Sequence, residues 1–128
     1  MAYYLNRELQ APFDVVVQRV IDALGREGFG VLTDIDVQAT LRKKLNADVP
    51  SYRILGACNP TLAHQALQTE NKLGVMLPCN VIVRDAGGGN VEVASVDPVG
   101  AMERVGNPAL APVAKQVREK LQRALDQV

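Results

Sequence analysis

Two strand-like segments joined by a glycine-rich turn constrain the fold of this chain more than any other feature. Residues 79–84 and 90–96 are rich in valine and isoleucine, and Asp85-Ala86-Gly87-Gly88-Gly89 lies between them. This pattern is typical of a β-hairpin. Strands joined so closely are antiparallel, because a parallel pair needs a crossover of a dozen residues or more. The glycines open no helix, so they do not form a phosphate-binding loop.

The other apolar patterns alternate between strand and helix periods. Strands are expected at 3–9, 29–35 and 52–58, and helices at 12–27, 37–45, 59–73 and from 107 onward. Residues 97–106 are interpreted as a covering loop. No repeat or linker divides the 128 residues, which fit one domain, 1–128. The order predicts an α+β fold of two layers, an antiparallel sheet with helices on one face.

Charge and composition exclude several classes of protein. Fourteen basic residues balance fourteen acidic ones and aromatic residues make up 4%, which argues against a nucleic-acid binder. The densest basic run, Arg42-Lys43-Lys44, is short and is interpreted as a solvated helix face. The first ten residues do not resemble a signal peptide, and no apolar run approaches the length of a membrane span. We therefore expect no membrane contact and a cytoplasmic location, where thiols stay reduced.

Both cysteines belong to a repeated cysteine–asparagine pattern, Cys58-Asn59 and Cys79-Asn80. Cys58 ends one expected strand and Cys79 begins the next, so antiparallel neighbours would bring the two thiols close together. Alternation assigns Cys58 to the face of Ile54, and Cys79 to the face of the valines that follow it. We expect both thiols to point toward the same apolar face. Burial as inert structural cysteines is the main alternative.

Glu70 falls within the apolar stripe of the helix expected at 59–73. Glutamate is rarely buried unless a partner satisfies it, so this side chain is a candidate proton donor or acceptor. The expected partners are the loop around Pro78 or the turn at Cys58 and Asn59. The alternative is that Glu70 lies at the edge of the stripe and reaches solvent.

A metal site is the weakest of the candidate sites. The set Cys58, His64, Glu70 and Cys79 has ligand types that zinc accepts, but it contains no closely spaced pair. Six residues turn a helix by roughly 600°, so His64 and Glu70 do not share a face. We therefore assign no metal ligand.

The longest distinctive runs are Tyr52-Arg53-Ile54-Leu55-Gly56-Ala57-Cys58-Asn59-Pro60, Ala63 to Leu67 with Glu70, and Leu77-Pro78-Cys79-Asn80-Val81. In these residues the chain resembles a bacterial and archaeal family catalogued as domain of unknown function 302. The resemblance covers nearly the whole length. It implies a TATA-binding-protein-like arrangement of strand, helix, four strands and helix, with two extra helical segments here, and association as homodimers. It identifies the fold without identifying a reaction, and the cofactor is unknown.

The leading functional hypothesis is a small cytoplasmic homodimer with a thiol-bearing pocket. Its candidate residues are Cys58, Asn59, Glu70, Cys79 and Asn80. The pocket would bind a small-molecule ligand or handle sulfur or redox equivalents. The first alternative is a structural or ligand-binding dimer whose cysteines are buried and inert, and the second is a Cys/His/Glu metal site.

The homodimer is also expected from the sheet itself. A sheet covered by helices on one face leaves the other face in need of cover, and small two-layer domains often find it in a second copy. Leu55, Ile82 and Val96 are the side chains expected on that second face.

Overall fold

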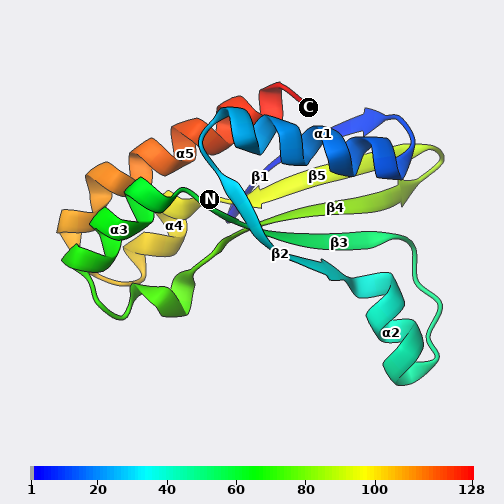
Figure 1. The fold of residues 1–128 in the computed structure, drawn as a ribbon, viewed down its shortest axis with the longest axis horizontal. Coiled ribbons are helices and arrows are strands. Elements are labelled where there is room, and N and C mark those ends of the chain that lie inside the picture. The colour runs from blue at the N-terminus through cyan, green and yellow to red at the C-terminus, as the bar shows by residue number, and fades with distance from the viewer. Residues whose placement is uncertain (1) are drawn as a thin grey trace.

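A computed structural model describes residues 2–128 and contains one antiparallel sheet (Figure 1). Its strand order is β1-β5-β4-β3-β2, and each neighbouring pair is antiparallel. The strands are β1 (Tyr4–Gln10), β2 (Gly30–Asp36), β3 (Tyr52–Cys58), β4 (Cys79–Gly87) and β5 (Asn90–Val96). The predicted hairpin is the β4–β5 pair, and the predicted two-layer α+β class is confirmed.

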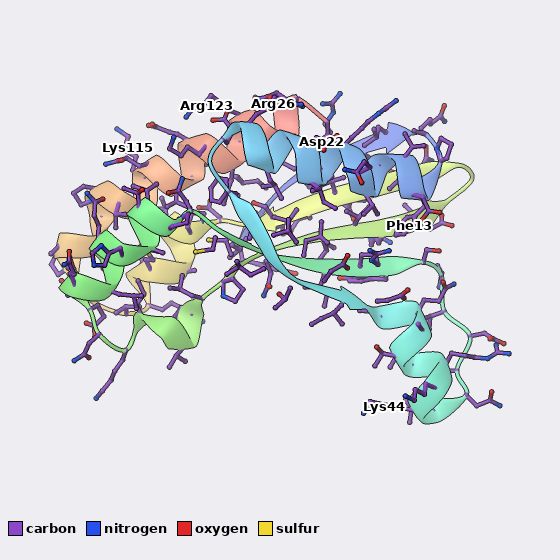
Figure 2. All side chains as sticks on the ribbon, viewed as in Figure 1. Phe13, Asp22, Arg26, Lys44, Lys115 and Arg123 are labelled. Atoms are coloured by element: carbon purple, nitrogen blue, oxygen red, sulfur yellow. The ribbon has the colours of Figure 1, made fainter. Side chains whose placement is uncertain are left out.

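Two long helices form the second layer, and shorter helices extend beyond it. The helices are α1 (Phe13–Arg26), α2 (Val37–Leu45), α3 (Pro60–Thr69), α4 (Pro98–Glu103) and α5 (Ala111–Asp126), with 3-10 turns η1 (Leu73–Met76) and η2 (Pro108–Leu110). Figure 1 shows α1 and α5 side by side over the sheet, α3 and α4 gathered beyond one end of it, and α2 projecting at the other end. The labelled Arg26, Lys115 and Arg123 side chains lie along the outer side of this helical layer (Figure 2).

The sequence of α1 explains both its packing and its end. Val16, Val20 and Leu24 repeat at helical spacing and are almost fully buried against the sheet. The helix then closes with paired hydrogen bonds, from Gly28 N–H to Gly25 O at 3.1 Å and from Phe29 N–H to Leu24 O at 2.9 Å. Gly28 has φ of +84°, a conformation that glycine adopts at low cost. This reversal sends the chain directly into β2.

The core lies between the sheet and the α1–α5 layer. Its sheet side consists of inward side chains of the three central strands, including Leu55, Val81, Val83 and Val93, each at most 1% exposed. The sequence expectation that Leu55 lies on the second face is therefore wrong, because it stands opposite inward-facing Val81 in the sheet register. Ile82 and Val96 are only partly buried and do lie on the uncovered face.

Residues 97–106 are not the expected covering loop, because α4 forms within them. Asp97 caps this helix, accepting a hydrogen bond from Val99 N–H at 3.0 Å, and Pro98 occupies its first turn. Asp97 also pairs with Arg118 of α5 at 3.1 Å. The cap and the ion pair together fasten α4 to α5.

The helix expected at 59–73 is shorter than the sequence pattern indicated. It ends at Thr69 because Glu70 adopts an extended backbone, and η1 follows as a separate turn. Within residues 2–128, no helix has both the length and the apolar character that crossing a membrane requires.

Candidate functional site

A cavity of about 350 Å³ opens where β3 ends and β4 begins, under the short helices α3 and α4. We call it the thiol pocket. Its lining residues are Phe29, Leu32, Thr33, Ala57, Cys58, Asn59, Leu62, Ala63, Ala66, Leu67, Leu77, Pro78, Cys79, Met102, Val113 and Val117. None of these residues is an aspartate, glutamate, lysine, arginine or histidine, so the walls are apolar apart from Thr33, Asn59 and the two cysteines.

Cys79 lies in the buried wall of the thiol pocket. Its side chain is on the inward face of β4, and the residue is 9% exposed. Burial, and to a smaller extent the neighbouring Cys58, raises the pKa of this thiol from its ordinary value of 9.0 to about 11. Cys79 is therefore protonated at neutral pH and is a weak nucleophile.

Cys58 differs from Cys79 because it is partly exposed. It is the last residue of β3, directly before the turn into α3. Both cysteines are free thiols. The accessible thiol of the pocket is therefore Cys58.

The positions of the two cysteines agree with only part of the sequence argument. Strands β3 and β4 are antiparallel neighbours, as predicted, and Ala57 stands opposite Cys79. Because opposite residues share a face, Cys58 has the other parity, and the predicted shared parity is wrong. Both thiols nevertheless line one pocket, since Cys58 ends its strand where the chain turns into α3.

The two asparagines of the repeated pattern have different positions. Asn59 lines the thiol pocket and caps α3, accepting a hydrogen bond from Leu62 N–H at 3.2 Å. Asn80 is exposed and lies on the opposite side of the sheet, because it follows inward-facing Cys79. Only the first asparagine thus belongs to the pocket.

Glu70 does not line the thiol pocket. Among residues 2–128, its carboxylate does not form the expected hydrogen bond with the loop around Pro78 or with the turn at Cys58 and Asn59. Its Oε1 lies 3.5 Å from Asn107 Nδ2, which also donates to Thr69 O at 3.3 Å. The reason is the early end of α3, which places Glu70 after the helix and near the start of η2.

The structure does not bring together the cysteine, histidine and glutamate side chains that were considered as metal ligands. His64 is exposed on α3 and does not line the thiol pocket. Among residues 2–128, no group of three or more histidine, cysteine, aspartate or glutamate side chains has an arrangement suited to a metal ion.

A glycine in β3 controls how closely the walls of the pocket approach each other. A Cβ atom on Gly56 would overlap Thr33 Oγ1 and lie 2.8 Å from Pro78 Cγ. Thr33 follows a bulge in β2, which leaves Leu32 in the pocket wall and 69% exposed. A glycine inside a strand pattern can signal such a close approach, and it is the sequence signal that could have located these residues.

Comparison with known proteins gives a family. The sequence profile described as "Domain of unknown function DUF302" matches residues 5–128. The chain belongs to this family. A similar solved structure is the "Crystal structure of uncharacterized conserved protein DUF302 from Bacillus stearothermophilus", with a TM-score of 0.92 and 25% identity over 99% of this chain and 98% of that one. No curated protein matches significantly. The family resemblance seen in the sequence is confirmed, and it brings a fold without an activity.

The sheet face opposite α1 and α5 forms a second feature of this DUF302 chain, which we call the open sheet face. A hollow of about 720 Å³ lies on it. Its lining residues are Tyr3, Tyr4, Tyr52, Asn80, Ile82, Arg84, Glu92, Ala94, Ser95 and Val96. Glu92 joins two strands here, accepting from Asn6 Nδ2 at 2.9 Å and from Arg84 Nε at 2.7 Å. The Asn6 hydrogen bond, then Arg84, lowers the pKa of Glu92, so this carboxylate stays charged at neutral pH.

Proposed function

We propose that the thiol pocket binds a small, neutral, largely apolar molecule, with Cys58 as the thiol that meets it. One observation carries this proposal: an uncharged cavity of about 350 Å³ with both cysteines of the chain in its wall. Small-molecule sites in proteins are typically apolar hollows of roughly 300–1,000 Å³ with a few polar groups. The thiol pocket matches this description in size and in lining.

The lining also defines the charge of the ligand. An apolar molecule gains roughly 25 cal/mol for each Å² of surface removed from water. A carboxylate or ammonium group would lose its hydration without gaining a charged partner, which is costly. The pocket therefore favours neutral molecules over anions and cations of the same shape.

The proposal gives the two thiols unequal roles. Sulfur or redox handling would depend on Cys58, because the thiolate is the reactive form and Cys79 stays protonated. Cys79 fits the alternative of an inert buried cysteine. The accessibility of Cys58 distinguishes a thiol-bearing site from a purely structural one.

A neutral fluorescent probe, N-phenyl-1-naphthylamine, tests the binding. We expect saturable fluorescence enhancement with the wild-type protein. Ala63→Phe, which fills the half-buried α3 wall, should weaken binding at least tenfold, whereas Ala39→Phe on the exposed surface of α2 should not change it. Circular dichroism would confirm that both variants fold. Absence of saturable binding, or equal binding by both variants, would contradict the proposal.

We further propose that two copies of the chain associate through the open sheet face. The register places Ile54, Ile82 and Ala94 in one row across this face, and each is only partly buried. The adjacent Arg84–Glu92 pair balances its own charge, so the face can meet a copy of itself without like-charge repulsion. Helix α2 has no buried residue, so its apolar side chains stay at least partly exposed within residues 2–128 of one chain.

Light scattering at micromolar concentration tests this association. We expect the mass of two chains for the wild type and of one chain for Ile82→Lys, which puts a charge in the middle of the apolar row. Gln18→Lys on the exposed side of α1 is the matched control and should remain a dimer. A monomeric wild-type protein would rule the interface out.

A further inference from the structure

Met102 lies in the wall of two separate hollows. It lines the thiol pocket, and it also lines a second hollow of about 490 Å³ between α4 and the start of α5, which we call the α4–α5 groove. Apolar residues such as Val99, Pro108, Leu110 and Ala114 line the groove, together with Asn107 and the charged Glu103 and Lys115. Within residues 2–128, Met102 is the one side chain common to both linings.

The exposure of the wall residues gives the thiol pocket an inner and an outer side. Leu32 is 69% exposed and Thr33 is also exposed, so β2 forms the outer side. Met102 is 7% exposed and forms part of the inner side. A molecule that enters past β2 with its polar end near Thr33 therefore meets Met102 with its apolar end.

Methionine is well suited to fill the irregular space between two hollows. Its side chain is unbranched, has three rotatable bonds and adapts to irregular spaces, whereas a branched side chain holds one shape. Met102 belongs to a helix of only six residues, and that helix is held through Asp97 at its start. The helix therefore holds the Met102 backbone in place, and the side chain separates the two hollows.

We infer that Met102 sets the length of an unbranched, neutral aliphatic chain that the thiol pocket accepts. The ligand class is a primary fatty alcohol or a molecule of equivalent shape, with the hydroxyl near Thr33 and Asn59. Chains that fill the pocket stop at Met102, and longer chains require the space of the α4–α5 groove behind it. This inference rests on the proposed function of the thiol pocket.

Displacement of N-phenyl-1-naphthylamine by a series of primary alcohols, from hexanol to hexadecanol, tests the inference. For the wild type, affinity should rise roughly fourfold per methylene while each added group is buried, and then stop rising at a limiting length. Met102→Ala should move that limit to longer chains, so that the affinity continues to rise roughly fourfold per methylene beyond the wild-type limit. Met102→Val should move it less, and Met102→Leu should leave it in place.

Met76→Ala is the matched control, because Met76 is exposed and lines neither hollow. Its limiting length should equal that of the wild type. The inference is overturned if alcohols displace the probe from the wild type but Met102→Ala and Met102→Val keep the same limit. If no alcohol or probe binds the wild-type protein, the proposed function fails instead.

Discussion

The buried thiol of Cys79 should make the folded protein lose stability in alkali. Burial raises its pKa from 9.0 to about 11, so between these values the unfolded chain releases a proton that the folded chain retains. Stability then falls as the pH rises, because the unfolded state binds fewer protons. The contribution of the protonated Cys79 thiol to stability is fully present below about pH 8 and is lost as the pH rises through 9 toward 11.

The size of the loss follows from the two pKa values. At about pH 10, the group lowers the free energy of unfolding by about 1.4 kcal/mol relative to neutral pH. Above about pH 11 the loss of unfolding free energy approaches the value that corresponds to a pKa difference of about two, which is about 2.7 kcal/mol. Either value is a substantial share of the stability of an ordinary small domain.

Urea unfolding followed by circular dichroism, with a reducing agent and at several pH values from 7 to 10, measures the effect. Cys79→Ala removes the group, so its alkaline loss should be smaller than that of the wild type by about 1.4 kcal/mol at pH 10. Cys58→Ala, which retains the buried thiol, should lose nearly as much as the wild type. Equal losses for the wild type and Cys79→Ala would refute the reasoning and would mean that water reaches this thiol in the folded state.

Two further predictions concern residues that hold elements around the thiol pocket in place. Gly56→Ala should destabilise the domain by about 1–3 kcal/mol in urea unfolding, because the added Cβ overlaps Thr33 Oγ1 and crowds Pro78. Adding Thr33→Ala should restore only part of that loss. An unchanged midpoint for Gly56→Ala would contradict the close approach of Thr33 and Pro78 to Gly56. Asp97→Ala should lower the free energy of unfolding by about 2 kcal/mol, since it leaves the Val99 N–H without its cap and Arg118 without its partner. Arg118→Ala removes only the ion pair and should lower it less. Similar losses for the two variants would contradict a capping role for Asp97.

The fold was predictable from sequence wherever the signal is local. Apolar periodicity located all five strands, and the Gly28 signal located the end of α1. Helix α4 was missed because Gly100 and Gly106 lower helix propensity across its segment. Its formation depends on the Asp97 cap and on the burial of Met102, and the second of these is a tertiary effect that the local sequence does not show.

The site was predictable only as far as strand order determines it. Neighbouring antiparallel strands explain why Cys58 and Cys79 line one pocket. Side-chain parity failed for Cys58, because the chain leaves the regular strand there and turns into α3. Helical periodicity failed for Glu70, because it was extended past the last helical residue, Thr69. Both errors occur at element ends, which are the least certain part of a pattern-based prediction.

The existence of the thiol pocket follows from the small side chains of its walls. Ala57 and Ala66 are buried, at 0% and 2% exposure, and their side chains are smaller than the valines and leucines that make up most of the core. Because α3 brings alanines to the ends of β3 and β4, it covers the strands without filling the space above them. A leucine at Ala63 or Ala66 would extend the core into that space, so the cavity depends on the sequence of α3. Its chemistry comes from the strand ends, where the backbone turns and leaves one thiol accessible and the other buried.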